Sequence, residues 1–442
     1  MADKNINGFT GMNNLVPAFW GGKGVVSPRV LLNADADESG QLVKRDGVTV
    51  YLALAGAHSL WSPDDDSCML CAANKKLYSI GTGTAVQIAT ITGPANEPLS
   101  YALAEGKIYI SNSYWRGVFD ASTSTVSDWG ITLPPGPMLL TSSGNLPAGT
   151  YHITFTAVSG GQLSGNGPIS SIELMTAGGI QILNRPSGAL VWATDQNGQV
   201  FQLVGAVDNV VDIPTIEPLP SFMCGPPPNM SVLMYAFGRM WGSTGNILYY
   251  SEPYQFGWFK ATSNFFKFNS SITIIAAVST GLFIGTGDST VFLAGAEPDQ
   301  MVQSSAGAGS IKGTLAYCNN LPELGDVLGT PEKGYSSVPV WRTSEGIVAG
   351  NTSGRLFNLT KTKLKMGIPE KGASLYRSKA GVFQFLTSAI LSSGATDAEA
   401  LTAFLSGKLP SNNIVNKNPT SSVGLTETVS AEQWRNGVLI ST

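Results

Sequence analysis

The sequence predicts an all-β protein built from repeated β-hairpins, and three observations carry this prediction. Short apolar runs recur along the chain, each bounded by Gly and a polar residue, which is typical of buried β-strands. Gly (51) and Pro (25) are abundant, whereas long stretches with helical spacing are almost absent. Charged residues make up only 13% of the chain, against roughly 25% in average soluble proteins. This composition favours many turns and few charged helix faces.

The clearest hairpin lies at residues 233–254. Apolar runs at 233–237 and 240–241 flank Gly238, and a Gly-Ser-Thr-Gly-Asn turn leads to a third run at 247–250. Gly adopts a positive φ at such turns without strain. The pattern recurs at 100–110, 275–284, 338–348 and 373–383, with turns predicted at 105–106, 280–281, 345–346 and 380–381. A repeated hairpin implies a repeated blade.

Length and charge limit the classes of protein. A chain of 442 residues is too long for one ordinary domain, so two or three structural units are expected. Proteins that bind nucleic acids usually carry an excess of positive charge, whereas this chain has a net charge of −4. Low surface charge promotes association, so we expect partners to cover much of the surface, with a polar Ser/Thr/Asn-rich surface as the alternative. Without a signal-peptide pattern or a run of about 18 apolar residues, we expect synthesis in a cytoplasm and no membrane insertion.

The chain begins with a segment unlike the rest. Residues 1–30 are rich in Gly and Asn without periodicity, and we expect an extended arm that is ordered by packing on something else. Residues 31–133 form the first part of the predicted β-structure. Their acidic segment, 35–40, lacks the EF-hand spacing and is interpreted as a solvated turn.

Two blade-like units follow within this first part. Eight short strands are predicted at 59–61, 68–72, 76–80, 86–90, 99–103, 107–111, 117–120 and 125–129. Trp61 and Tyr101 are about 40 residues apart, which is the spacing of consecutive four-stranded blades. This spacing predicts a β-propeller, for which we expect six blades, and a β-sandwich with coincidental spacing is the alternative. Propeller blades leave short protected edges and therefore tolerate a low charge.

The sequence pattern of residues 134–228 differs from that of the predicted blades. Proline motifs bracket them, PPGP at 134–137 and GPPP at 225–228. Inside, apolar residues alternate from Tyr151 to Ala157, a Gly-rich turn follows, and further strands are predicted at 169–175, 180–183, 189–194, 199–204 and 210–213. No Cys-Trp-Cys arrangement marks a true immunoglobulin domain. The segment therefore predicts an inserted immunoglobulin- or fibronectin-like β-sandwich.

Residues 229–391 continue the predicted propeller. Blades are expected at 231–259 and 266–293, another starts near Gly309, and the last unit spans 372–388. Residues 392–442 form a C-terminal segment. Its stretch 396–406 is expected to be helical behind a Thr-Asp cap, and 431–439 is expected to add a strand that closes the ring.

We assign no catalytic, cofactor-binding or metal-binding residue from the sequence. Cys68 and Cys71 form a lone CxxC without a second pair at zinc spacing, and ordinary reduced thiols are expected for all four cysteines. His58 and His152 lie in strand-like runs without the context of a triad. The Gly-rich segments 160–165 and 281–287 do not connect a strand to a helix, as a nucleophile elbow or phosphate loop would.

Loop carboxylates are one remaining set of candidates for chemistry. Glu252, Asp288 and Asp299 are of the kind that a propeller glycosidase uses, but a glycosidase pair requires proximity that spacing does not reveal. Charged loop residues normally face solvent, which is the ordinary interpretation.

Aromatic residues are the other set. Tyr114, Trp115, Trp192, Trp258 and Phe259 are candidates to line a sugar- or protein-binding face, with core packing as the ordinary alternative. Trp258 and Phe259 follow a Pro-Tyr-Gln-Phe-Gly loop and are expected to be half-exposed.

Several segments together resemble virion proteins of tailed bacteriophages. They are GFTGMNNL near the N-terminus, LVKRDG at 42–47, TYHITFTAV at 150–158, GRMWGSTGNILYYSEPY at 238–254, VWRTSEGIVAG at 340–350, SLYRSKAGVFQF at 374–385 and RNGV at 435–438. The most similar type is the tail hub or nozzle protein, which forms the distal end of a short tail. The resemblance extends over nearly the whole chain and is weakest after Ser392.

The resemblance implies a β-propeller with an inserted sandwich, six copies of which surround a channel through which the genome leaves. It also implies a tail adaptor or connector above the ring and fibres or spikes at its side, and it carries no catalytic motif. We therefore expect a non-enzymatic virion protein, assembled in the bacterial host cytoplasm, that DNA passes without sequence-specific binding. The alternatives are a receptor- or glycan-binding adhesion protein and a propeller hydrolase of polysaccharide.

Overall fold

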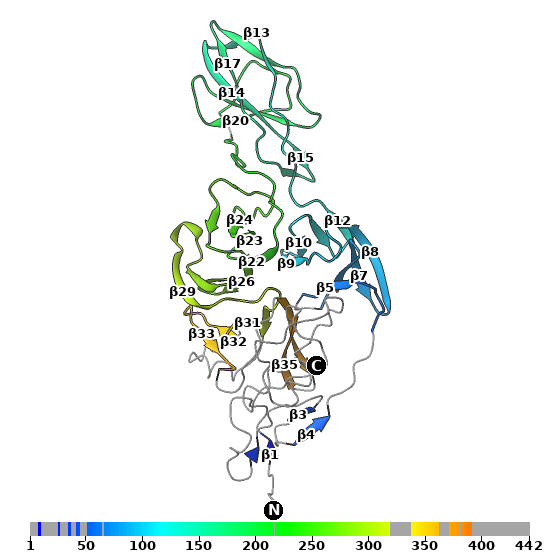
Figure 1. Cartoon of the computed structure of the whole chain (residues 1–442). Coiled ribbons are helices and arrows are strands. Elements are labelled where there is room, and N and C mark those ends of the chain that lie inside the picture. Colours follow the sequence, from blue (N-terminus) through cyan, green and yellow to red (C-terminus); the bar gives the residue numbers. More distant parts are fainter. Residues whose placement is uncertain are drawn as a thin grey trace, which may run out of the picture. The chain divides into compact units, whose positions relative to one another are not determined.

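The computed structural model describes residues 8–9, 25–26, 34–36, 41–44, 51–63, 66–215, 217–318, 337–361, 371–379 and 382–390. The chain divides into two compact units, Tyr51–Asn269 and Met1–Val50 with Ser270–Thr442. Strands dominate both units (Figure 1), and the one helical element among the described residues is the 3-10 turn η1 (Pro298–Gln300). The all-β prediction is confirmed for this part of the chain.

The unit of residues 51–269 contains three four-stranded antiparallel sheets in which chain neighbours are sheet neighbours. The first holds β5 (Ala57–Trp61), β6 (Leu70–Ala73), β7 (Lys76–Gly81) and β8 (Thr84–Thr90). The second holds β9 (Ser100–Ala104), β10 (Lys107–Ser111), β11 (Arg116–Asp120) and β12 (Thr125–Ser127). The third holds β22 (Val232–Ala236), β23 (Arg239–Thr244), β24 (Ile247–Tyr250) and β25 (Phe265–Lys267). This is the strand order predicted for blades.

The other unit repeats the same order. One sheet holds β26 (Ile272–Val278), β27 (Gly281–Thr286), β28 (Ser289–Ala294) and β29 (Val302–Ala308). The next holds β30 (Ala316–Cys318), β31 (Val338–Thr343), β32 (Gly346–Gly350) and β33 (Leu356–Asn358). The hairpin of β34 (Lys371–Lys379) and β35 (Val382–Ile390) follows. Short pairs are formed by β1 (Gly8–Phe9) with β2 (Val25–Val26) and by β3 (Ala34–Ala36) with β4 (Leu42–Lys44).

The tight turns explain why the strands pair in this register. Two consecutive positive-φ residues form the turn at Asn74 and Lys75, at Glu105 and Gly106, and at Phe237 and Gly238. This is the type I′ geometry, whose twist matches that of the flanking strands. The turn predicted at 105–106 is therefore confirmed.

Two predicted turns are wrong by one residue. The β26–β27 turn is formed by residues 279–280 and the β31–β32 turn by 344–345, so Gly281 and Gly346 are the first residues of strands. A Cβ at Gly281 would lie 2.2 Å from the Leu293 carbonyl oxygen, and one at Gly346 would lie 2.3 Å from Thr360 Oγ1. These glycines allow close approach of a neighbouring strand or side chain rather than forming the turn.

Neighbouring sheets of residues 51–269 share apolar cores. Leu70, Leu77, Ile108 and Phe119 bring the first two sheets together, and each buried side chain of this size stabilises the fold by roughly 1.5–3 kcal/mol. At this contact Trp61 stacks on Tyr101 with ring centroids 5.2 Å apart, and the Tyr101 hydroxyl donates to the Ser59 carbonyl at 2.8 Å. Burial raises the pKa of that phenol. The 40-residue spacing therefore identified a real contact between sheets.

The second and third sheets pack together although the inserted segment separates them in sequence. Backbone N–H groups of Met230 and Leu233 donate to the hydroxyls of Ser111 and Ser100, at 2.9 and 2.8 Å. Trp129, at the end of the second sheet, donates its Nε1–H to the Phe256 carbonyl at 2.8 Å. The boundary predicted between the next two blades is wrong, because residues 265–267 pair with β24 and complete the third sheet. A loop of 14 residues, 251–264, separates β25 from its partner β24, so the hairpin pattern in the sequence did not reveal their pairing.

Residues 134–228 form two antiparallel sheets around a core of their own. One sheet has the order β13 (Leu139–Leu146), β18 (Gly178–Ile182), β21 (Asn209–Val210). The other has the order β17 (Ser170–Leu174), β14 (Gly149–Thr156), β19 (Leu190–Thr194), β20 (Phe201–Gly205). The hairpin β15 (Val158–Ser159) and β16 (Gln162–Leu163) projects from them. Tyr151, Ile153, Phe155, Ile180 and Val191 are buried between the sheets, as the alternation predicted.

Several predictions lie outside the described residues. They are most of the arm at 1–30, residues 37–40 of the acidic segment, the turn at 380–381, the helix at 396–406 and the closing strand at 431–439.

Candidate functional site

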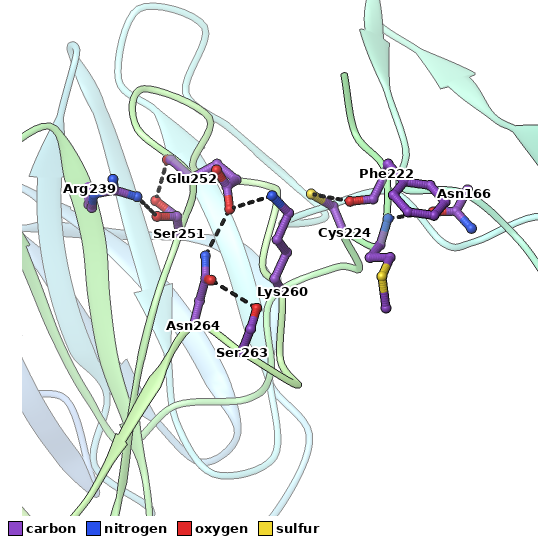
Figure 2. A network of polar contacts seen from close by, with 10 residues as sticks. Asn166, Phe222, Cys224, Arg239, Ser251, Glu252, Lys260, Ser263 and Asn264 are labelled. Carbon is purple, nitrogen blue, oxygen red and sulfur yellow. Dashed lines mark hydrogen bonds and ion pairs between the residues drawn. The ribbon is translucent and has the colours of Figure 1, made fainter. Parts of the chain in front are cut away.

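Figure 2 shows polar contacts on a loop of the third sheet and, beside them, polar contacts within the inserted two-sheet segment; backbone and side-chain bonds join these two parts. We call this connection the joint, and it consists of residues 163–167 and 221–225 from the insertion and of the loop 251–264. Glu252 Oε1 accepts hydrogen bonds from Lys260 Nζ at 3.2 Å and from Asn264 Nδ2 at 2.8 Å. Ser263 Oγ lies 3.1 Å from Asn264 Oδ1. The carboxylate thereby ties together both ends of the loop.

Backbone hydrogen bonds hold this loop against the end of the insertion. The Gly225 N–H donates to the Phe259 carbonyl at 2.8 Å, and the Phe259 N–H donates back at 3.0 Å. The Glu252 N–H donates to the Trp258 carbonyl at 2.9 Å. Two reciprocal backbone bonds form a small ladder, which restricts both segments more than side-chain contacts alone would.

The insertion contributes a second set of bonds. Trp258 Nε1–H donates to the Leu163 carbonyl at 2.7 Å, and the Ser221 hydroxyl donates to the Ser164 carbonyl at 2.7 Å. The Met223 N–H donates to Asn166 Oδ1 at 2.6 Å. A Cβ at Gly165 would lie 1.6 Å from the Cys224 carbonyl oxygen, so only glycine fits there. The hairpin β15–β16 is thus fixed to the loop 251–264.

The other end of the loop is anchored on strands of the third sheet. Arg239 Nη1 donates to the Ser251 carbonyl at 2.9 Å, and its guanidinium lies 5.7 Å from the centroid of the Tyr250 ring. The Ser251 hydroxyl accepts the Met240 N–H at 3.0 Å. Cation–π and hydrogen-bond contacts of Arg239 therefore fix the start of the loop.

The cysteine of the joint is not suited to nucleophilic chemistry. Burial raises the pKa of the Cys224 thiol to about 11, with Lys260 acting in the opposite direction and Glu252 reinforcing the shift. The thiol is therefore protonated at neutral pH, whereas a reactive cysteine needs a lowered pKa. Burial also raises the pKa of Cys71, and that of Cys318 to about 12. Cys68, Cys71, Cys224 and Cys318 are free thiols.

The three predicted carboxylates have different surroundings. Glu252 is engaged by Lys260 and Asn264, while Asp288 and Asp299 are exposed residues of the other compact unit. Among the residues that the structure describes, no group of three or more His, Cys, Asp or Glu side chains could hold a metal ion.

The aromatic candidates divide between core and surface. Trp192 and Phe259 are each 1% exposed, so the expectation that Phe259 is half-exposed is wrong. Its backbone ladder with Gly225 draws it inside, where it packs against Trp129. Trp258 is half-buried, as expected, and Trp115 packs partly against the core of the first two sheets. Tyr114 is half-exposed and covers Gly93.

Tyr254, which sequence reasoning did not single out, is the most unusual residue of the loop. It has a φ of +56° directly after Pro253, at the turn position where glycine or asparagine is usual. Its N–H donates to the Gly238 carbonyl at 2.7 Å, and its ring lies so close to Gly238 that a Cβ there would be 2.8 Å from Cζ. The ring is 65% exposed. The sequence signal that could have identified a turn at Tyr254 was the proline before it, since proline is common at the first central position of a turn.

The histidines and Gly-rich segments have structural surroundings. His58 Nε2 lies 3.0 Å from the Ala95 carbonyl oxygen, and His152 Nδ1 lies 2.6 Å from Ser171 Oγ. Gly160 and Gly161 form the β15–β16 turn with positive φ, and residues 281–286 are strand β27. No direct signal for the joint is present in the sequence, because its members are spread over about 100 residues, and only the proline motifs mark its ends.

Comparisons with known proteins give little beyond this description. No family model matches the chain, and no curated protein matches it. Similar solved structures include the WD40 domain of Neurospora crassa Pan2, with 11% identity, 75% of this chain and 85% of that one covered, and a TM-score of 0.30. Another is Saccharomyces cerevisiae Sqt1, with 10% identity, 73% and 76% covered, and a TM-score of 0.28. A third is BBS1N in complex with ARL6DN, with 7% identity, 78% and 90% covered, and a TM-score of 0.30. At TM-scores this low, the likeness to these structures supports no conclusion about this chain.

No helix in the described part of the chain is long and apolar enough to span a membrane.

Proposed function

We propose that this chain is a structural protein of a bacteriophage tail, one subunit of a ring-shaped nozzle or tail hub. The ring extends the tail channel for genome ejection and anchors fibres or spikes. The observation that carries the proposal is the joint, where backbone ladders and side-chain bonds fix the inserted segment to a blade loop. A fixed projection suits a subunit that must hold other tail components in place, and the segments that resemble phage virion proteins point in the same direction.

In this proposal the four-stranded sheets are blades of a closed six-bladed propeller. Five described sheets have the meander order of blades, and the hairpin β34–β35 supplies strands of the sixth. The strand that the sequence predicts at 431–439, which lies outside the described residues, would complete the closure. Closure removes sheet edges from the inside of the ring and makes the subunit stiff.

The insertion is proposed to be an immunoglobulin- or fibronectin-like sandwich. Its order β17-β14-β19-β20 corresponds to strands C′, C, F and G, and the pairing of β13 with β18 corresponds to B with E. Strand β21 departs from that pattern, because it occupies the position of D but follows G in the chain. Tyr151 donates its hydroxyl to the Pro147 carbonyl four residues earlier, a bond like that of a tyrosine corner, though on strand C.

The charge of the chain is compatible with a DNA conduit. With a net charge of −4, a ring of such subunits repels phosphates on average and lets DNA slide without sticking. The proposed partners are further copies of this chain, a tail adaptor or connector, and fibres or spikes. The proposed location is the virion tail, with assembly in the bacterial host cytoplasm, without an enzymatic activity.

One observation favours the alternative of a receptor- or glycan-binding protein. Tyr254 exposes 65% of its surface from a conformationally strained turn, and such strain is often found at ligand sites. Exposed aromatic rings also suit sugar or protein contacts. Saturable binding on a glycan array that is lost in Tyr254→Ala would favour this function over the tail ring.

Electron microscopy of the purified chain, alone and mixed with a candidate adaptor, tests the proposal. We expect rings with a central channel in at least one of the two samples. Isolated single subunits in both samples would contradict it. New reducing ends after incubation with host envelope glycans would instead indicate a polysaccharide hydrolase.

A further inference from the structure

The outermost strands of the sheets differ in length. In the five four-stranded sheets outside the inserted segment, the last strand in the chain lies at one edge: β8, β12, β25, β29 and β33. Strands β12, β25 and β33 have 3 residues each, whereas β8 and β29 have 7 each. Short edge strands are one of the devices that keep folded proteins from pairing with other chains. Three sheets use this device and two do not.

The two long edges also lack two of the other protective devices, charged residues and proline, although each contains a β-bulge where its register with the neighbouring strand shifts. Strand β8 reads TAVQIAT and β29 reads VQSSAGA, so neither contains a charged residue or a proline. The short strand β25, by contrast, ends in Lys267. Each long edge presents an exposed valine, Val86 at 60% and Val302 at 67%. Uncharged seven-residue strands with exposed β-branched side chains are templates for strand pairing.

The outer sides of both strands carry no further hydrogen-bonded strand within the described chain. Strand β8 pairs with β7 and β29 pairs with β28, and no further strand of the described residues joins either sheet (Figure 1). A row of backbone N–H and C=O groups on such a side adds a strand by main-chain hydrogen bonds, with side chains on alternate positions supplying specificity.

We infer that β8 and β29 are the assembly edges of the chain, and that β29 of one copy pairs with β8 of the next. This inference rests on the proposed ring and names the surfaces that build it. The two edges have the same length and the same lack of charge, and one lies in each compact unit. A heterologous contact uses both of these edges in every copy, so a closed ring leaves neither β8 nor β29 exposed.

The test places a charge on each edge in turn. A lysine on an edge strand opposes pairing, because pairing would desolvate it. We expect Val86→Lys and Val302→Lys each to lower the native mass, measured by light scattering, from that of the ring to that of one 46.3 kDa chain. A 1:1 mixture of the two variants retains one intact β29 and one intact β8, so it should form dimers and nothing larger.

Matched variants separate an edge effect from a folding effect. Val86→Thr keeps a β-branched, uncharged residue and should retain the ring. Thr125→Lys places the same charge on the exposed short edge β12 and should also retain the ring. Circular dichroism of the two valine-to-lysine variants should match the unmodified chain, since both valines are exposed.

The outcomes distinguish this inference from the proposed function. If the unmodified chain forms a ring and both lysine variants keep its mass, the edges are not the interface, although the ring stands. If either lysine variant alone forms dimers, the edges pair with themselves and the head-to-tail arrangement is wrong. If the unmodified chain stays monomeric with and without a candidate adaptor, both the ring and its edges are refuted.

Discussion

The inserted segment and the sheets on either side of it are stabilised in different ways. The insertion buries a core made only of its own residues, such as Ile153, Phe155 and Val191. The flanking sheets share one core, in which Ala102 and Trp129 from before the insertion pack with Met230 and Phe259 from after it. The insertion is therefore closed on itself, whereas the flanking sheets depend on each other.

The largest effect is expected for Trp129→Ala, in the shared core. Trp129 is 2% exposed, contacts Tyr109 and Phe259, and bonds to the Phe256 carbonyl. We expect a loss of about 3–5 kcal/mol from the free energy of unfolding. Because two sheets share this residue, both should lose protection together in hydrogen exchange. Protection lost by β22–β25 alone would show that the sheets do not depend on each other.

Ile153→Ala, at the centre of the insertion's own core, gives the contrasting result. Ile153 is fully buried in that core, and its truncation should cost about 2–5 kcal/mol. Exchange protection should fall in β13–β21, while β9–β12 and β22–β25 keep theirs. A loss that spreads equally to these two sheets would contradict the independence of the insertion.

Alkaline pH should weaken the sheet of β30–β33 through a buried thiol. Burial raises the pKa of Cys318 from its ordinary value of 9.0 to about 12 in the folded state. The unfolded thiol ionises first, so this contribution to stability is present below pH 9 and is lost as the pH rises towards 12. Cys318→Ala should reduce the fall in melting temperature between pH 8 and pH 11. An equally steep fall in that variant would assign the effect to other groups.

The smallest effect is expected at the joint. Trp258→Phe removes the bond to the Leu163 carbonyl but keeps an aromatic ring, so about 1 kcal/mol should be lost. We expect faster proteolysis of the segment at 163–167 with little change in the melting temperature. Glu252→Gln is the matched control, since its partly exposed ion pair with Lys260 contributes only about 0–1 kcal/mol. Equal protease sensitivity in the two variants would show that the Trp258 bond does not fix the hairpin.

Hairpin periodicity predicted the four-stranded meander sheets well, because a strand buried on both faces needs an apolar run and a tight turn at each end. The strands of the first two sheets and most strands of the insertion were predicted for this reason. Strand β25 was assigned to the wrong blade because its partner β24 lies across a long loop, and periodicity does not report pairing over such distances. Gly281 and Gly346 were misplaced because a glycine needed for close approach looks the same in sequence as one needed for a turn.

The joint could not be predicted at all. Its bonds connect Trp258 with Leu163 and Gly225 with Phe259, and most of them use backbone groups that every residue carries. The burial of Phe259 follows from this ladder and not from the residues beside it in sequence. Long-range backbone pairing leaves no compositional trace, so only the proline motifs at 134–137 and 225–228 marked where the insertion begins and ends.

Native mass spectrometry of the full chain, alone and with a candidate adaptor, tests the proposed tail ring most directly. We expect a closed particle of about six chains of 46.3 kDa, formed by the chain itself or once the adaptor is present. A strict monomer in both samples would contradict the tail-ring function and would favour the glycan-binding alternative.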